Sequence, residues 1–179
     1  MLPKYEIEEI LFAEFISVTG GVLAGLGLTL FIDKILAQPG LFILLPGLLA
    51  MRGDISATMA ARLTAALHLH RLKPTTTHSK LIRDNTIAAF ALALLDGAAL
   101  GVVAFIATQL VFNTYNPTII AIALIAALAS TVFMLPLTTV AVFWLFKHGF
   151  EPDDIMGPYV TTIGDIIMIA SIYLAVILV

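Results

Sequence analysis

Long apolar runs recur along this chain, and they constrain its fold more than any other feature. Hydrophobic residues make up 60% of the 179 residues, mean hydropathy is +1.06, and charged residues are only 12%, about half the share found in a soluble domain. About 20 apolar residues suffice to cross a bilayer as a helix, and five segments are candidates. Their approximate ranges are 10–36, 40–69, 85–112, 118–146 and 157–179. We therefore expect an all-α integral membrane protein with five transmembrane helices, in a single domain that covers residues 1–179.

The loops between these segments predict which side of the membrane each terminus occupies. The connection between the second and third segments carries one acid, Asp84, against four basic residues. The four basic residues are Arg71, Lys73, Lys80 and Arg83. Because Lys and Arg gather on the cytoplasmic side of membrane proteins, we expect this loop and the short amino-terminal segment 1–9 inside the cell. An odd number of spans then places the carboxyl terminus outside.

Two features interrupt the second apolar segment. Pro46-Gly47 removes a backbone donor and adds a flexible residue, and Arg52-Gly53-Asp54 places opposite charges near the middle. Irregular backbone at membrane depth is tolerated only where it is buried in protein or lines an aqueous cavity. A broken helix also offers carbonyl oxygens to an ion. We therefore expect the second helix to be broken at both places, unless Arg52 or Arg62 pairs with Asp54 and merely neutralises it.

Two further acids lie inside the apolar segments. Asp165 follows Gly164 in the last segment, and Asp96 lies within the third. A carboxylate at membrane depth is costly unless it faces water, a partner group or a cation, so an intramembrane acid is a candidate functional site. Asp165 is the first candidate for an ion ligand. Three roles stay open for Asp96, divided evenly between function and structure: a second ion ligand or a proton relay on one side, and an acid paired with a neighbouring helix on the other.

Small residues indicate where helices approach closely. Gly21 and Gly25 are four residues apart in the first segment, and Gly97 and Gly101 have the same spacing in the third. Such steps allow helix backbones to pack tightly in lipid, where no hydrophobic driving force brings helices together. We interpret both steps as ordinary helix-packing sites.

Two motifs in this chain resemble the signatures of the MgtE-type magnesium transporters. The first comprises Leu41–Leu49 (LFILLPGLL), Gly53-Asp54, Thr58 and Ala61–Thr64 (ARLT). The second comprises Pro136, Glu151–Asp154 (EPDD), Pro158, Thr161-Thr162 and Gly164-Asp165. The first motif, together with the preceding Phe31-Ile32-Asp33, is closer to the solute-carrier branch of that superfamily. The motifs have the expected order and spacing, and the resemblance covers nearly the whole chain.

The resemblance implies a five-helix unit that works as a pair. Bacterial members are homodimers, whereas solute-carrier members carry two such units in one chain, so this chain resembles a half-transporter that forms a homodimer in the cell membrane. In the family, the aspartate that matches Asp165 faces the transport pathway and binds the ion. Bacterial members also carry cytosolic CBS domains that sense magnesium. We see none in this sequence and expect regulation, if present, to come from a separate soluble partner.

The residue chemistry suits Mg²⁺ as the transported ion, with Mn²⁺ or Co²⁺ as alternatives. Mg²⁺ prefers oxygen ligands and is usually held through one or two carboxylates with several waters retained. Two Asp165 side chains across a two-fold axis would hold a hydrated ion, and the hydroxyls of Thr161 and Thr162 and the carbonyls near Gly53 would receive its waters. Asp54 stands where the family has asparagine, and it adds negative charge only if it faces the pathway. The chain has no cysteine and no clustered histidine, so a soft site for zinc or copper is not expected.

Three functions remain open. The first is a channel or carrier for Mg²⁺ in which Asp165 binds the ion. The second is a Na⁺- or H⁺-coupled Mg²⁺ exchanger in which Asp54 or Asp96 handles the coupling ion. The third is a non-transporting membrane subunit. We do not expect an enzyme, an organic cofactor or a nucleic-acid partner, because no nucleophile–base pair, cofactor loop or basic block is present.

Overall fold

The computed structural model describes residues 4–73 and 79–179, and their side chains except those of residues 4–10 and 13. Within these ranges the chain forms helices and no strand. The helices are α1 (Lys4–Thr29), α2 (Ile32–Ala37), α3 (Pro39–His68), α4 (Lys80–Phe112), α5 (Thr118–Lys147) and α6 (Pro152–Leu178). The all-α prediction is therefore confirmed. Of the predicted amino-terminal segment 1–9, residues 4–9 belong to α1, and residues 1–3 lie outside the described part.

Four of these helices, α3 to α6, are long and apolar enough to cross a membrane. The first predicted span is different. Helix α1 is 26 residues long, and its continuously described side chains form the shorter apolar stretch Glu14–Thr29, which by itself is below the ~20 residues of a full crossing. The chain is thus a multi-pass membrane protein, and the fifth crossing by α1 stays a prediction.

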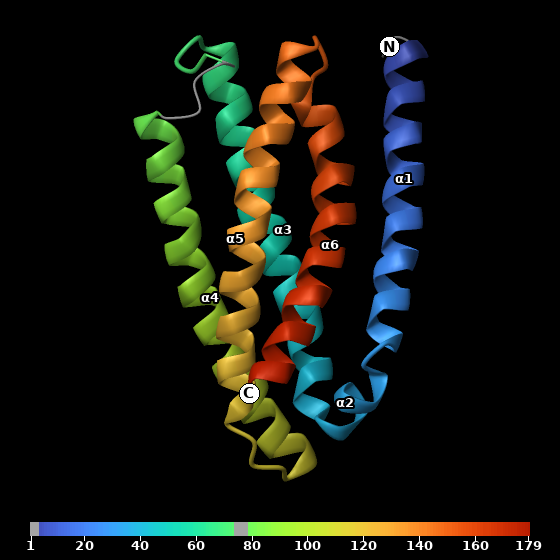
Figure 1. Cartoon of the computed structure of the whole chain (residues 1–179), viewed down its shortest axis with the longest axis vertical. Coiled ribbons are helices and arrows are strands. Elements are labelled where there is room, and N and C mark those ends of the chain that lie inside the picture. Colours follow the sequence, from blue (N-terminus) through green and yellow to red (C-terminus); the bar gives the residue numbers. More distant parts are fainter. Residues whose placement is uncertain (1–3, 74–78) are drawn as a thin grey trace.

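The four long helices form one bundle, and α1 stands at its edge beside α6 (Figure 1). The amino-terminal end of α1 lies at the same end of the bundle as the α3–α4 and α5–α6 connections. The carboxyl end of α6 lies toward the opposite end, with α2. The start of α1 and the α3–α4 connection thus share one end of the bundle, and which end faces the cytoplasm stays a prediction.

The predicted break in the second span is wrong. Helix α3 continues without interruption from Pro39 to His68, with Pro46 inside it. A proline removes only one hydrogen bond from the helix ladder, and a glycine costs about 1 kcal/mol relative to alanine, so neither ends a helix that neighbours hold in place. The charge of Arg52, which suggested a break, is compensated by α6 instead.

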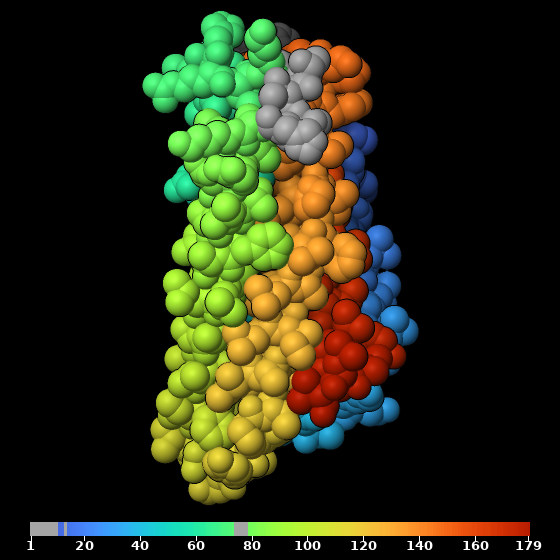
Figure 2. Space-filling view, turned by 60° about the vertical axis from the view of Figure 1, so that its left-hand side comes forward, coloured from blue at the N-terminus to red at the C-terminus, as the bar shows by residue number. Residues whose placement is uncertain are grey.

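Close packing between α4 and α5 depends on small residues, as predicted. A Cβ on Gly97 would lie 2.8 Å from the Cβ of Ala127, and one on Gly101 would lie 2.9 Å from the Cα of Ile120. Figure 2 shows the two helices lying side by side along the height of the bundle. The step in α1 behaves differently, because Gly21 and Gly25 have no atom within 4 Å of an added Cβ. The neighbouring residue Gly20 contacts α6 in their place.

Candidate ion-binding site

Asp165 forms an ion pair with Arg52 of α3. The guanidinium Nη2 donates to Asp165 Oδ1 at 2.6 Å, and Nη1 donates to the backbone carbonyl of Val160 at 2.6 Å. The Arg52 side chain is 4% exposed and that of Asp165 is 22% exposed. The arginine is thus enclosed by protein, while its carboxylate partner keeps some access to the surroundings.

Gly164 makes room for this pair. Val160, Gly164 and Met168 are four residues apart and form one buried face of α6, and the guanidinium lies directly against Gly164. A Cβ at that position would overlap Arg52 Nη1. Gly164 therefore leaves space for the Arg52 guanidinium, and Asp165 neutralises its charge.

The pair lies near mid-depth of the bundle. Both Arg52 and Asp165 are thirteen residues after the first residue of their helices, or about 20 Å along the axis at 1.5 Å per residue. Helices α3 and α6 run in opposite directions (Figure 1), and His68 at the end of α3 lies 3.2 Å from Glu151 at the start of α6. Residues near the middle of both helices consequently meet.

The two threonines before Asp165 face different surroundings. Thr161 is exposed, and its hydroxyl donates to the carbonyl of Gly157 at 3.0 Å. Thr162 is half-buried and faces α1, where a Cβ on Gly20 would overlap its methyl group. Within the described residues the Thr162 hydroxyl has no hydrogen-bond partner. Thr161 thus lies one turn from Asp165 on the exposed side of α6, and Thr162 lies between α6 and α1.

The candidate residues of α3 lie on its open side. Asp54 is exposed, and Gly53 is half-buried with nothing within 4 Å of an added Cβ. Because α3 is continuous, the carbonyl of Gly53 belongs to a regular helix rather than to a break. Among the described residues neither arginine pairs with Asp54. Arg52 binds Asp165, and Arg62 Nη1 donates to Asn85 Oδ1 at 3.0 Å.

Asp96 lies apart from the Arg52–Asp165 pair. Helix α4 contacts α3 on both sides of Asp96 along its length: Asn85 accepts a hydrogen bond from Arg62, and the side chain of Leu100 packs against Gly47. Asp96 is half-buried near the middle of α4, and no ion pair with it occurs in the described ranges. The structure therefore brings Asp165 and Arg52 together and leaves Asp96 on the α4 side of α3.

The main residue that the sequence reasoning missed is Arg52 as the partner of Asp165. For Arg52 the sequence offered Asp54, two residues away in the same segment, as the alternative partner. A better signal is depth, because opposite charges at equal distance from the same end of two antiparallel spans can meet. Counting from the end where α3 finishes and α6 begins, Arg52 and Asp165 are matched to within about one turn.

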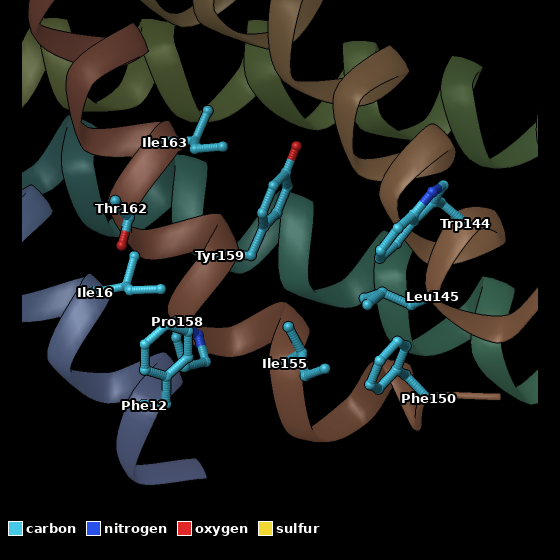
Figure 3. A pocket seen from close by; sticks show the side chains of 10 residues that line it. All are labelled: Phe12, Ile16, Trp144, Leu145, Phe150, Ile155, Pro158, Tyr159, Thr162 and Ile163. Carbon is cyan, nitrogen blue, oxygen red and sulfur yellow. The ribbon is translucent and has the colours of Figure 1, made fainter. Parts of the chain in front are cut away.

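An apolar cavity of about 350 Å³ lies between α1, α5 and α6 (Figure 3). Its lining includes Phe12, Trp144 and Tyr159, and it contains no charged side chain. Apart from the hydroxyl-bearing Tyr159 and Thr162 the lining is almost wholly apolar, which suits an apolar group better than a hydrated cation. In addition, the described residues contain no cluster of three or more His, Cys, Asp or Glu side chains. They offer single carboxylates at membrane depth, which suit a hydrated ion that passes through.

Comparison with known proteins identifies a family. A family model named MgtE and described as a divalent cation transporter matches residues 45–176. The matched range contains Arg52, Asp54, Asp96 and Asp165, and it extends from α3 to α6. Neither a curated protein nor a solved structure matches the chain. Because the family model covers most of its length, this multi-pass membrane protein belongs to the MgtE family of divalent cation transporters.

Proposed function

We propose that the protein transports Mg²⁺ as one half of a homodimer, along a pathway lined by α3 and α6, with Asp165 of each protomer binding the hydrated ion. One observation carries this proposal. Polar and acidic residues form exposed stripes on α3 and α6 at membrane depth, and the stripe on α6 ends at Asp165.

The stripe on α6 is continuous along one side of the helix. Asp154, Gly157 and Thr161 are exposed, and they precede Asp165 at spacings of three and four residues. Residues with these spacings share one face of a helix. The stripe therefore leads from the end of the bundle that carries the α5–α6 connection down to the Arg52–Asp165 pair.

The stripe on α3 also faces away from the protomer core. Asp54, Thr58, Ala61 and Arg62 are exposed and follow the same helical spacing. Asp54 lies near the middle of a helix that crosses the membrane, where facing hydrocarbon would cost at least about 2.5 kcal/mol. By contrast, the outer sides of α4 and α5 expose apolar residues such as Leu95 and Phe133. The apolar outer surface of α4 and α5 suits contact with lipid, whereas the polar surface of α3 suits contact with water or protein.

A two-fold axis beside α3 and α6 accounts for this difference. One protomer supplies a single polar wall, and a second copy in a symmetric dimer supplies the same wall from the opposite side. A hydrated divalent cation between the two walls would meet two Asp165 carboxylates, with Thr161 hydroxyls and Asp54 nearby. The chain is then a half-transporter, and its basic α3–α4 connection and segment 1–9 face the cytoplasm.

Flux measurements on purified protein in liposomes test the proposal. We expect wild-type protein to move Mg²⁺ without any counter-gradient, and Asp165→Asn to lower the rate at least tenfold while the dimer stays assembled. Asp33→Asn, which changes an exposed acid of the short helix α2, is the matched control and should keep the wild-type rate. Wild-type flux through the Asp165→Asn variant would refute the assignment of the ion ligand.

Asp96 supports a second candidate function, coupled exchange. It is a half-buried acid near the middle of a transmembrane helix without an ion-pair partner among the described residues, and such acids often carry coupling ions or protons. If the protein is an exchanger, Mg²⁺ flux will vanish when the Na⁺ and H⁺ gradients are removed. The Asp96→Asn variant would then lose the coupled flux. Coupled flux at the wild-type rate in this variant would leave Asp96 without a coupling role.

A further inference from the structure

We propose that Arg52 is a built-in competitor for the transported ion: its guanidinium occupies Asp165 while no ion is bound, and an entering divalent cation must displace it. This inference rests on the proposed function, because it takes Asp165 to be an ion ligand. It adds a residue that sets the affinity of the site without itself binding the ion.

The position of the guanidinium is the first reason. Arg52 donates to two oxygens of α6, the Asp165 carboxylate and the Val160 carbonyl, each at 2.6 Å. Carboxylate and carbonyl oxygens are the ligand types that a hard divalent cation prefers. The arginine therefore occupies the Asp165 carboxylate that a cation entering along α6 would otherwise find free.

The balance of charge is the second reason. Arg52 and Asp165 together are neutral, so two such pairs across a dimer axis contribute no net attraction for a cation. The same site with both arginines moved aside carries two negative charges. When only a fraction of the protein is competent to bind, the apparent affinity falls by that fraction. The strength of the Arg52–Asp165 contact thus limits how tightly the resting site holds its ion.

The unequal burial of the two partners is the third reason. Asp165 remains 22% exposed, whereas Arg52 is 4% exposed. An ion can approach the carboxylate from the side of Thr161 without first crossing the arginine. When the guanidinium leaves Asp165, it can retain one hydrogen bond, because Nη1 donates separately to the Val160 carbonyl. Partial withdrawal of Arg52 is then enough to free the acid.

Three variants test the competition in the full-length protein. Arg52→Gln removes the charge but keeps a polar side chain, Arg52→Lys keeps the charge, and Gly164→Ala displaces the guanidinium because a Cβ would overlap Nη1. The measurements are half-saturating Mg²⁺ for liposome flux and the Mg²⁺-dependent rise in melting temperature of the purified protein. The second readout reports ion binding without requiring transport.

We expect Arg52→Gln to lower half-saturating Mg²⁺ at least tenfold in both measurements, because a unit charge a few ångströms from the ion is removed. Arg52→Lys should stay within about threefold of wild type, since it preserves the competing charge. Gly164→Ala should shift in the same direction as Arg52→Gln. It serves as the independent test if Arg52→Gln does not fold.

The outcomes separate this inference from the proposed function. Wild-type flux that depends on Asp165, combined with unchanged or weaker Mg²⁺ binding in a folded Arg52→Gln or Gly164→Ala variant, overturns the competition and leaves the transport proposal intact. A purely structural arginine would give that result. Absence of wild-type Mg²⁺ flux and binding overturns both proposals together.

Discussion

A double-mutant cycle on the Arg52–Asp165 pair is the most informative measurement of stability in this fold. Asp165→Asn removes the negative charge and leaves Arg52, which is 4% exposed, without a counter-ion. Breaking a buried ion pair by removing one partner typically costs about 3–5 kcal/mol, because an uncompensated charge remains in the interior. Since Asp165 itself is 22% exposed, water reaches the site in part, and we expect the lower end, about 3 kcal/mol.

The double variant, Arg52→Gln with Asp165→Asn, should be far less destabilised than the two single variants combined. A neutral pair has no charge to desolvate, and replacing a buried ion pair by neutral groups is often close to neutral in stability. The remaining cost is the charged hydrogen bond from Nη1 to the Val160 carbonyl, about 1.5–3 kcal/mol. Arg52→Gln alone loses the same hydrogen bond, so that cost cancels in the cycle. We therefore expect a coupling energy of about 3 kcal/mol between the two sites, at the upper end of the range measured for residues in contact.

The assay is reversible unfolding of the purified protein in mixed micelles, with helix content followed by circular dichroism for all four proteins of the cycle. Strict additivity, with a coupling energy below about 0.5 kcal/mol, would show that the side chains do not depend on one another. The description of the site as a buried ion pair would then be wrong, whatever the flux experiments give.

Two further predictions concern packing and charge. Gly97→Ala should destabilise the protein by about 1–3 kcal/mol, as overpacking does, because its Cβ would lie 2.8 Å from that of Ala127. Gly21→Ala is the control: the space there is open, so this variant should be neutral or stabilise the protein by up to about 1 kcal/mol. The same unfolding assay distinguishes the two variants. Asp54→Asn, which introduces the residue that the family carries there, should keep Mg²⁺ flux but raise half-saturating Mg²⁺ about two- to tenfold, since an exposed negative charge at membrane depth is lost; an unchanged liposome titration would place Asp54 outside the pathway.

The helical membrane fold was predictable because the apolar runs leave few alternatives. Backbone groups in lipid must bond within their own segment, so long apolar runs become helices. The boundaries of α5 and the carboxyl end of α4 agree closely with the sequence, since Asn116 and Pro117 mark the turn between them. The start of α1 was harder to place. Its early residues are acidic, and an apolar window cannot show that the helix continues through them to Lys4.

The site was only partly predictable, for a physical reason. Sequence spacing gives the depth of a residue and the face of a helix on which it lies, and a spacing of four residues places Thr161 on the same face as Asp165. Which helix that face meets depends on how the spans are arranged. For this reason Thr162, one residue from Thr161, proved to face α1, and Arg52 proved to face α6 rather than Asp54. The predicted break in α3 was wrong for the same reason: the carboxylate that neutralises Arg52 is 113 residues away in sequence.

The continuous α3 changes how the ion ligands should be ranked. A broken helix would have offered carbonyl oxygens near Gly53, whereas a continuous one keeps its carbonyls in hydrogen bonds and presents only side chains. Asp54 is the exposed acid near the middle of α3, and Asp165 is the half-buried acid near the middle of α6. If the two helices line one pathway, a cation meets an unneutralised carboxylate at Asp54 and a neutralised one at Asp165. Asp54 would then attract the cation, and Arg52 would compete with it for Asp165. For this reason Asp54→Asn should lower Mg²⁺ affinity, whereas Arg52→Gln should raise it.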